Sequence, residues 1–335
     1  MSSEAPQRVA VVGAGAWGTA LAQTAARAGR SVLLLARDPK VAAAITDERR
    51  NPRYLPDIPL CPSIEASLDL DLAAGADAVL LAVPAQTVRE TLRLLPALRG
   101  PLVICAKGFE RASGLRLSEV VASERPGQAI AVLSGPNFAH EIAKGQPAAT
   151  TLASADPRLG GALARALSGR HFRAYWTDDV VGVEVGGAVK NVLAIAAGIV
   201  MGLRLGENAR AGIITRGLAE LARLGEAMGA RRETLAGLAG LGDVVLTCTS
   251  LTSRNTAFGH ALGQGAAAAE LRARPGPLAE GAFTAAAVVR LAERHGVDLP
   301  IARVIDDVLE GRLEVGKALE RLMRRPLRAE RALGS

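Results

Sequence analysis

A glycine-spaced stretch near the start of the chain, residues 8–19 (RVAVVGAGAWGT), constrains the fold more than any other part of the sequence. Its apolar run predicts a short buried strand, and Gly13, Gly15 and Gly18 follow with the spacing G-x-G-x-x-G before an alanine-rich helical segment. The first glycine of such a pattern permits a tight turn, the second lets the backbone approach a pyrophosphate, and the third lets helix and strand pack closely. The stretch therefore predicts a dinucleotide-binding βαβ unit with phosphates at the helix N-terminus.

The composition narrows the choice of ligand. Aromatic residues make up only 3% of the chain, which argues against base stacking, and the net charge of +7 comes from arginines dispersed among acidic residues. We therefore expect phosphorylated small molecules as ligands and no nucleic acid. Cys61, Cys105 and Cys248 lie far apart without a C-x-x-C pair, which predicts reduced thiols in a cytoplasmic protein. The chain has four histidines and no H-x-x-x-H pattern, so we expect no metal site.

Strand-like and helical segments alternate only in the first half of the chain. The predicted strands after the first are residues 31–36, 76–84, 101–106, 129–133, 148–153 and 172–176, with a helix at 86–95. From residue 180 onward the predicted elements are helices, at residues 183–203, 208–228, 253–262, 284–295, 301–310 and 315–323. The fold class is therefore α/β, with a doubly wound Rossmann domain over residues 1–180 followed by an all-α domain over residues 181–335. Segment 183–203 is apolar enough to resemble a membrane span, but Glu184 and Lys190 indicate a helix buried in protein.

The end of the second predicted strand decides which dinucleotide fits. An acidic residue there would bind ribose hydroxyls, whereas an arginine would favour a 2′-phosphate. Arg37 comes first and Asp38 second, which favours NADP with NAD also accepted. Asp38 is either a ribose ligand or the N-cap of the next helix, and Arg37 could alternatively be a solvated loop charge.

Two later strand ends also carry candidate ligand residues. In open α/β sheets, ligands gather beyond the carboxyl ends of the strands. Lys107 follows the strand at 101–106, where it could meet a phosphate or a carbonyl, or serve as a structural lysine in a turn. Gly135, Asn137 and Ala139 follow the strand at 129–133, and we expect this segment near the nicotinamide.

The helical half contains a charged pair in apolar surroundings. Lys190 lies in GGAVKNVLAIAAGIV, where an unpaired ammonium would be costly to desolvate. Burial would lower the pKa of such a lysine and suit it to proton transfer, while a carboxylate partner would oppose that shift. Asp243, in GLGDVVLTCTS, is the natural partner. The alternative is a purely structural buried ion pair.

A hydroxyl-rich segment follows Asp243 and opens a predicted helix. Ser253, Arg254 and Asn255 combine a hydroxyl, a guanidinium and a helix N-terminus, a set that suits a phosphate dianion. The simpler interpretation is a capping motif with a surface arginine. Glu280 in LAEGAFTA could bind a cofactor or be an acid in the first turn of a helix.

Taken together, these stretches resemble the NAD(P)-dependent glycerol-3-phosphate dehydrogenases of the soluble bacterial type. The matching stretches are AVVGAGAWGTALA, NPRYLPD, CAKGFE, SGPNFAHEIA, EVGGAVKNVLAIAAGI, GLGDVVLTCTSLTSRNTAFG and AEGAFTA, which occur in order over almost the entire chain. The resemblance implies reversible reduction of dihydroxyacetone phosphate to sn-glycerol 3-phosphate with NADP or NAD. It also implies a role in supplying glycerophospholipid biosynthesis, and a homodimer.

The resemblance implies roles for individual residues. Lys190 would be the general acid for reduction and the proton acceptor for oxidation, Asp243 would orient it, and Lys107 would touch both cofactor and substrate. The implied substrate-binding residues are Lys107, Gly135, Asn137, Lys190, Asp243, Ser253, Arg254 and Asn255. The expected cofactor-binding residues are Gly13, Gly15, Ala16, Trp17, Gly18, Arg37, Asp38, Lys107, Ala139, Arg254, Leu278 and Glu280. Ala16 departs from the family pattern, which has a hydroxyl residue there, so we expect one phosphate hydrogen bond fewer.

Two other functions fit parts of the sequence. A β-hydroxyacid or sugar-acid dehydrogenase would share the two-domain plan, but the Ser253-Arg254-Asn255 segment and the GGAVKN setting of Lys190 argue against it. A redox-sensing regulator could use a Rossmann fold to detect cofactor and would then bind nucleic acid through a basic recognition helix. The sequence shows no such helix.

Overall fold

The computed structural model describes residues 5–274 and 279–326, and the chain forms two compact units. The first unit consists of the chain up to residue 107 together with residues 115–183. The second consists of residues 108–114 and the chain from residue 184 onward. The short segment 108–114 therefore belongs with the second unit, although it lies well before residue 180 in the sequence.

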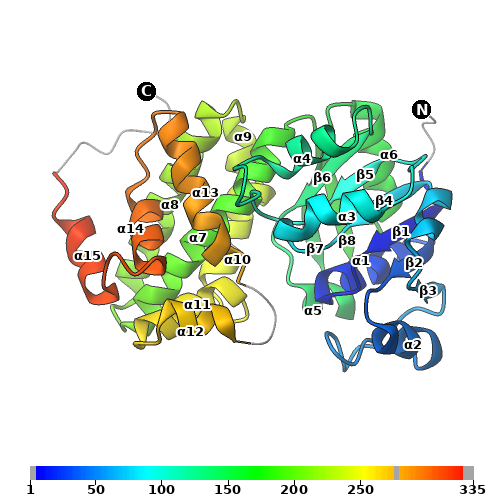
Figure 1. The fold of residues 1–335 in the computed structure, drawn as a ribbon, viewed down its shortest axis with the longest axis horizontal. Coiled ribbons are helices and arrows are strands. Elements are labelled where there is room, and N and C mark those ends of the chain that lie inside the picture. The colour runs from blue at the N-terminus through cyan, green and yellow to red at the C-terminus, as the bar shows by residue number, and fades with distance from the viewer. Residues whose placement is uncertain (1–4, 275–278, 327–335) are drawn as a thin grey trace. The chain divides into compact units, whose positions relative to one another are not determined.

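The first unit is built on an eight-stranded sheet with the order β3-β2-β1-β4-β5-β6-β7-β8 (Figure 1). The strands are β1 (Arg8–Val12), β2 (Ser31–Leu35), β3 (Ile64–Ser67), β4 (Ala78–Leu81), β5 (Leu102–Ile104), β6 (Ile130–Ser134), β7 (Ala148–Ala153) and β8 (Phe172–Thr177). Strands β1 to β6 are parallel in the order 3-2-1-4-5-6, which is that of dinucleotide-binding folds. Strand β7 runs antiparallel to β6, and β8 runs parallel to β7.

The helical segments of the first unit connect these strands. They are α1 (Ala16–Arg27), α2 (Pro39–Asp47), η1 (Leu70–Gly75), η2 (Ala85–Thr87), α3 (Val88–Leu94), α4 (Leu117–Glu124), α5 (Ala139–Lys144) and α6 (Pro157–Leu167). Helices α2 and α6 both begin with an Asp-Pro pair, in which the aspartate carboxylate accepts a hydrogen bond from the first turn and proline fixes the first helical φ. Central strands such as β4 are buried along their whole length, as covering on both faces requires.

Strand β3 lacks the apolar run by which the other strands were predicted. Strand β3 (IEAS) pairs with β2 at the edge of the sheet, and only Ile64 of its four residues is fully buried. An edge strand with one buried side chain produces no continuous apolar run, so the pattern that finds β4 and β6 does not find β3.

The second unit is all-α in its described residues, in agreement with the predicted fold class (Figure 1). Its elements are α7 (Val180–Gly202), α8 (Glu207–Ala227), α9 (Arg232–Leu235), η3 (Leu238–Gly242), α10 (Asp243–Cys248), α11 (Arg254–Gly263), α12 (Ala268–Ala273), α13 (Gly281–Arg294), α14 (Pro300–Leu309) and α15 (Val315–Met323). Helix α7 is long and apolar enough to cross a membrane, but 89% of its most apolar window is buried inside the structure. It is therefore packed as a core helix.

Glycines let α7 pack closely against its neighbours. A Cβ atom on Gly198 would lie 2.1 Å from the carbonyl oxygen of Thr256, and one on Gly259 would lie 2.1 Å from that of Ile195. Real Cβ atoms do not approach carbonyl oxygens this closely, so α7 and α11 touch backbone to backbone. A Cβ on Gly186 would similarly lie 2.5 Å from the carbonyl oxygen of Ala239, which places η3 against the same helix.

Candidate active site

The three glycines after β1 form a compact cradle with an open centre. Gly13 has φ +106°, and a Cβ there would lie 2.8 Å from the carbonyl oxygen of Ala82, while a Cβ on Gly18 would lie 1.8 Å from the carbonyl oxygen of Gly13. Gly15 differs, because its φ of −73° suits any residue and a Cβ there would meet no atom within 4 Å. Gly15 therefore keeps a space empty in front of the N-terminus of α1, which has no side-chain cap. This arrangement fits a pyrophosphate.

A buried asparagine supports the cradle from behind. The Nδ2 of Asn51 donates hydrogen bonds to the carbonyl oxygen of Ala14 (2.9 Å) and to Oγ1 of Thr19 (2.8 Å). Its Oδ1 accepts from the backbone N–H of Tyr54 at 3.3 Å. NPRYLPD is one of the stretches that resemble the family, but no local signal in it shows that its first residue, Asn51, is completely buried.

Three of the expected cofactor residues share one apolar cluster. Ala16, Trp17 and Ala139 pack against a core that includes Leu55 and Ile58. The indole N–H of Trp17 donates to the carbonyl oxygen of Cys105 at 3.1 Å. The structure thus brings together residues that lie more than 120 positions apart in the sequence.

Arg37 and Asp38 have different surroundings. Oδ1 of Asp38 accepts from the backbone N–H of Lys40 at 3.0 Å, and its Oδ2 pairs with Nη1 of Arg53 at 3.0 Å. Asp38 is therefore the N-cap of α2, and both of its oxygens are engaged. The Arg37 side chain is exposed and makes no hydrogen bond or ion pair to any described residue.

The ends of β5 and β6 meet around Lys107. Its Nζ donates to the carbonyl oxygen of Gly135 at 2.8 Å. Asn137 donates through Nδ2 to Oγ1 of Thr150 at 3.0 Å, whereas its Oδ1 is buried without a hydrogen-bond partner among the described residues, as is Oγ of Ser134. Buried polar atoms without partners are rare and costly, so these two suit a ligand that hydrogen-bonds there.

A buried triangle of side chains surrounds the ammonium of Lys190. Nζ lies 3.0 Å from Oδ1 of Asp243 and 2.9 Å from Oγ1 of Thr247, and the Thr247 hydroxyl in turn donates to Oδ1 of Asp243 at 3.1 Å. The side chains of Lys190 and Asp243 are 10% and 1% exposed. The predicted pair is therefore present, and Thr247 is a third member that the sequence pattern does not reveal.

Local backbone geometry brings the triangle together. Gly186, one helical turn before Lys190, allows the close approach of α7 to η3, which is a π-helix that leads directly into Asp243. Thr247 lies one turn further along α10, on the same face as Asp243. Burial raises the pKa of the neighbouring Cys248 thiol to about 12, while the charge of Lys190 lowers this pKa and that of Asp243 raises it.

The start of α11 presents backbone N–H groups and one guanidinium. Oγ of Ser253 caps the helix by accepting from the N–H of Thr256 at 3.3 Å, which leaves the N–H groups of Arg254 and Asn255 without intrahelical acceptors. The Asn255 side chain is buried between Asn191, whose Oδ1 accepts its Nδ2 at 2.8 Å, and the N–H of Gly281, which donates to its Oδ1 at 2.9 Å. Asn255 therefore connects α7, α11 and the start of α13.

Arg254 and Glu280 interact electrostatically. Arg254 is exposed as a whole residue, yet crowding of its guanidinium by protein atoms lowers its pKa, and the carboxylate of Glu280 opposes that shift. Glu280 is half-buried at the N-cap of α13. Leu278, the remaining expected cofactor residue, lies outside the described residues.

The described residues contain no group of three or more His, Cys, Asp or Glu side chains that could hold a metal ion. Cys61, Cys105 and Cys248 are all unpaired, and burial raises the pKa of the Cys105 thiol far above its ordinary value.

The strand order, the glycine cradle and the helical second unit define a dinucleotide-binding α/β protein of the two-domain dehydrogenase class. The model of the NAD-dependent glycerol-3-phosphate dehydrogenase N-terminus matches residues 8–160, and the model of the C-terminus of the same family matches residues 179–320. The chain belongs to this family.

Known relatives match nearly the whole length of the chain. A glycerol-3-phosphate dehydrogenase (NAD(P)+) of Rhodospirillum rubrum is 54% identical over 96% of this chain and 93% of its own length. One of Methylobacterium radiotolerans is 53% identical over 98% of this chain and 99% of its own. The crystal structure of glycerol-3-phosphate dehydrogenase from Coxiella burnetii has a TM-score of 0.90 and 39% identity, covering 97% of this chain and all of that one.

Proposed function

We propose that this protein catalyses the reversible reduction of dihydroxyacetone phosphate to sn-glycerol 3-phosphate with NADPH or NADH. The relatives that match nearly the whole chain carry this activity in their names. The observation that carries the proposal is the buried contact of Lys190 with Asp243 and Thr247, since a lysine held in this way can supply a proton to a carbonyl oxygen.

Lys190 acts as the proton donor in this proposal. An ammonium has three N–H bonds, and within the described residues two of them are directed at Asp243 and Thr247. The third donates to the carbonyl oxygen of the substrate, stabilises the negative charge that develops there and then transfers its proton. A reduced nicotinamide, when bound, would supply the hydride that the carbonyl carbon accepts. In the oxidation direction, neutral Lys190 takes the proton from the hydroxyl group of glycerol 3-phosphate.

Asp243 and Thr247 position Lys190. The hydroxyl hydrogen of Thr247 is used in the hydrogen bond to Asp243. A lone pair of its oxygen therefore faces the ammonium of Lys190 and accepts a hydrogen bond from it. Asp243 neutralises the lysine charge in apolar surroundings, which lets the ammonium stay buried without a bound substrate.

The start of α11 binds the substrate phosphate in this proposal. Arg254 offers a guanidinium and a backbone N–H, and Asn255 offers its backbone N–H because its side chain is already used by Asn191 and Gly281. Ser253 fixes the turn that exposes these groups. A helix N-terminus with an adjacent arginine suits a dianion. Lys107, Gly135 and Asn137 are the proposed substrate residues of the first unit.

The glycine cradle, Ala16, Trp17 and Ala139 would hold the dinucleotide, with Lys107, Arg254, Leu278 and Glu280 as further contacts. The empty space at Gly15 supports this assignment. We accordingly assign cofactor binding to the domain of residues 1–180 and substrate binding to that of residues 181–335, with segment 108–114 grouped with the latter.

Arg37 selects NADPH over NADH in this proposal. Its exposed guanidinium lacks a partner among the described residues, whereas Asp38 is engaged as a helix cap and by Arg53, so a 2′-phosphate would meet a free cation. Arg37→Ala should weaken NADPH binding about tenfold and leave NADH nearly unchanged. Arg50→Ala, which removes an exposed arginine paired with Glu48 in the loop after α2, is the matched control. Equal weakening of both cofactors by Arg37→Ala would refute this assignment.

The first test is the loss of reduced-nicotinamide absorbance when the purified protein meets dihydroxyacetone phosphate with NADPH or with NADH. Unphosphorylated dihydroxyacetone serves as the control substrate. Oxidation of the cofactor only with the phosphorylated ketone is the expected result, and the two rates give the cofactor preference. No oxidation with either cofactor would overturn the proposed substrate.

We further propose that the enzyme is a cytoplasmic homodimer that supplies glycerophospholipid synthesis. The three unpaired cysteines support a reducing compartment, and the proposed product is the backbone of glycerophospholipids. Light scattering on the eluting protein tests the dimer. Depletion of the protein in growing cells tests the supply role, because glycerophospholipid synthesis should then depend on added glycerol 3-phosphate.

A further inference from the structure

The first turn of α13, which directly follows Glu280 at the N-cap, contacts other helices of the second unit. The N–H of Gly281 donates to the buried Oδ1 of Asn255 at 2.9 Å, and a Cβ on Gly281 would lie 2.4 Å from the carbonyl oxygen of Asn191. The turn is therefore pressed against α7.

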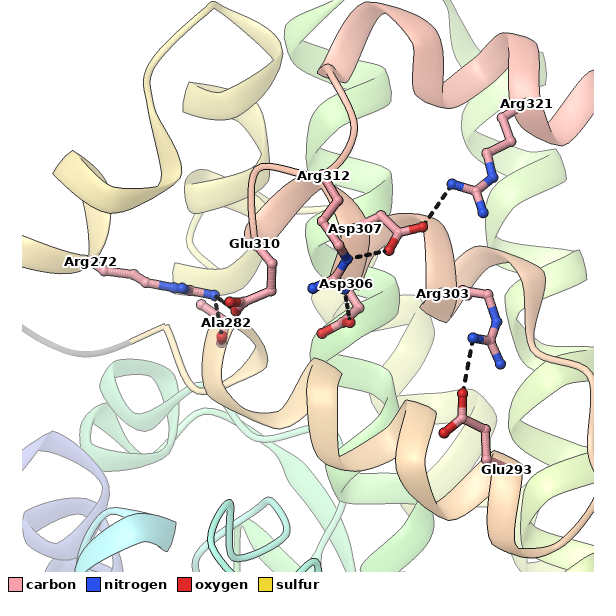
Figure 2. A network of polar contacts seen from close by, with 9 residues as sticks. All are labelled: Arg272, Ala282, Glu293, Arg303, Asp306, Asp307, Glu310, Arg312 and Arg321. Atoms are coloured by element: carbon pink, nitrogen blue, oxygen red, sulfur yellow. Dashed lines mark hydrogen bonds and ion pairs between the residues drawn. The ribbon is translucent and has the colours of Figure 1, made fainter.

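Arg272 also contacts the first turn of α13 (Figure 2). Its Nη2 donates to the carbonyl oxygen of Ala282 at 3.0 Å and to Oε1 of Glu310 at 3.0 Å. Arg272 lies on α12 and Ala282 on α13, so this hydrogen bond joins the two helices. The side chains of Arg272 and Glu310 are 24% and 33% exposed, and such partly buried charged pairs keep a more defined geometry than exposed ones.

The stability of α13 does not by itself explain this contact. A positive charge near a helix N-terminus opposes the helix dipole, which favours anions there. The carboxylate of Glu310 neutralises the charge of Arg272. The guanidinium of Arg272 therefore acts on the helix mainly as a hydrogen-bond donor to the first-turn carbonyl oxygen of Ala282. The arrangement therefore indicates that Arg272 determines where the turn lies.

A chain of ion pairs fixes the end of α14, where Glu310 lies. Arg312 pairs with Asp306 and Asp307, and Arg321 of α15 pairs with Asp307 at 2.7 Å (Figure 2). Burial would raise the pKa of Asp307, but the hydrogen bonds from Arg312 and Arg321 outweigh it and lower the pKa. Asp307 therefore stays ionised. The C-terminal helix is thus linked through α14 to Arg272.

We propose that Arg272, oriented by Glu310, is a positioning residue that holds the first turn of α13 so that Glu280 can contact the dinucleotide. This inference depends on the proposed role of Glu280 in cofactor binding. Arg272 itself touches no reacting group. Its effect should therefore fall on cofactor affinity and not on the proton transfer by Lys190.

The test measures NADPH dissociation constants by fluorescence titration, a readout that requires no turnover. Arg272→Ala should raise the dissociation constant about five- to tenfold, Glu310→Gln about two- to threefold, and Arg272→Lys less than Arg272→Ala. The KM for dihydroxyacetone phosphate should change less than about twofold. The matched control is Arg303→Ala, which breaks a pair with Glu293 that also joins α14 to α13 but lies apart from Arg272 (Figure 2).

A double-mutant cycle shows whether Arg272 acts through Glu280. If it does, Arg272→Ala should add little to the loss of NADPH affinity caused by Glu280→Ala. Additive losses, or an Arg272→Ala dissociation constant equal to that of Arg303→Ala, would overturn the proposal. Should the wild-type protein bind NADPH without reducing dihydroxyacetone phosphate, the proposed substrate would be wrong, and the affinity comparison would still decide the role of Arg272.

Discussion

The candidate site of the first unit consists mainly of backbone groups, whereas that of the second unit consists of side chains. In the first unit the glycine cradle is mainly backbone: three glycines, a helix N-terminus and carbonyl groups, with the buried Asn51 donating a hydrogen bond to the carbonyl oxygen of Ala14. In the second unit the candidate chemistry depends on buried side chains from separate helices, namely Lys190 on α7 and Asp243 with Thr247 on α10. A backbone site therefore tolerates little change in residue volume, whereas a side-chain site tolerates little change in chemical group.

Replacement of Lys190 is the variant for which we expect the largest effect. Lys190→Ala should lower turnover about a thousandfold, because the proton donor is lost, and leave the NADPH dissociation constant within about twofold. Single-turnover kinetics and fluorescence titration measure the two effects. Retained turnover would show that the proton comes from another group. Thr247→Val, which preserves shape and removes only the hydroxyl, should have a smaller effect on turnover.

Glu220 is a buried acid of the second unit with a structural role. Both carboxylate oxygens of Glu220 accept hydrogen bonds from the start of α14, from the N–H of Ile301 at 2.7 Å and that of Ala302 at 3.1 Å. Burial nevertheless raises the pKa of Glu220 to about 7, and the two backbone hydrogen bonds and Arg223 only partly offset this effect. Glu220 is thus a structural acid in the unit that also contains the candidate catalytic pair.

This raised pKa predicts a pH-dependent stability. The folded form holds the proton more tightly than the unfolded form, so the contribution of Glu220 is complete below the unfolded pKa of 4.5 and is lost as the pH rises through about 7. The difference in unfolding free energy between wild type and Glu220→Gln should therefore fall by roughly 3 kcal/mol across this range. Urea unfolding at several pH values measures it. A difference that does not vary with pH would contradict the assignment.

Two alanine substitutions in the first unit separate packing from binding. Gly18→Ala places a Cβ 1.8 Å from the carbonyl oxygen of Gly13, so it should reduce the unfolding free energy by about 1–3 kcal/mol. Gly15→Ala meets no atom within 4 Å and should leave stability within about 0.5 kcal/mol while weakening NADPH binding about tenfold. Thermal unfolding and fluorescence titration distinguish them. Equal destabilisation by both variants would show that Gly15 is also a packing residue.

The same contrast explains what the sequence could reveal. The glycine spacing and the buried strands such as β4 are local patterns, so both were predictable, and the isolated charges of Lys190 and Asp243 in apolar segments predicted their pairing. Strand β3 and the antiparallel course of β7 were not predicted, because pairing partners at a sheet edge are decided by tertiary contacts. Thr247 and Asn51 were missed because an ordinary polar residue gains its role only from what it faces in space.

Segment 108–114 has a consequence for how this protein can be divided. The chain leaves the first unit after Lys107, contributes the completely buried Phe109 to the second unit and returns at Leu115. A gene cut near residue 180 would therefore separate segment 108–114 from the second unit, to which it belongs. The two halves therefore cannot be exchanged independently between relatives. In a chimaera joined at a single crossover near residue 180, Phe109 from one parent would have to fit a second unit from the other parent.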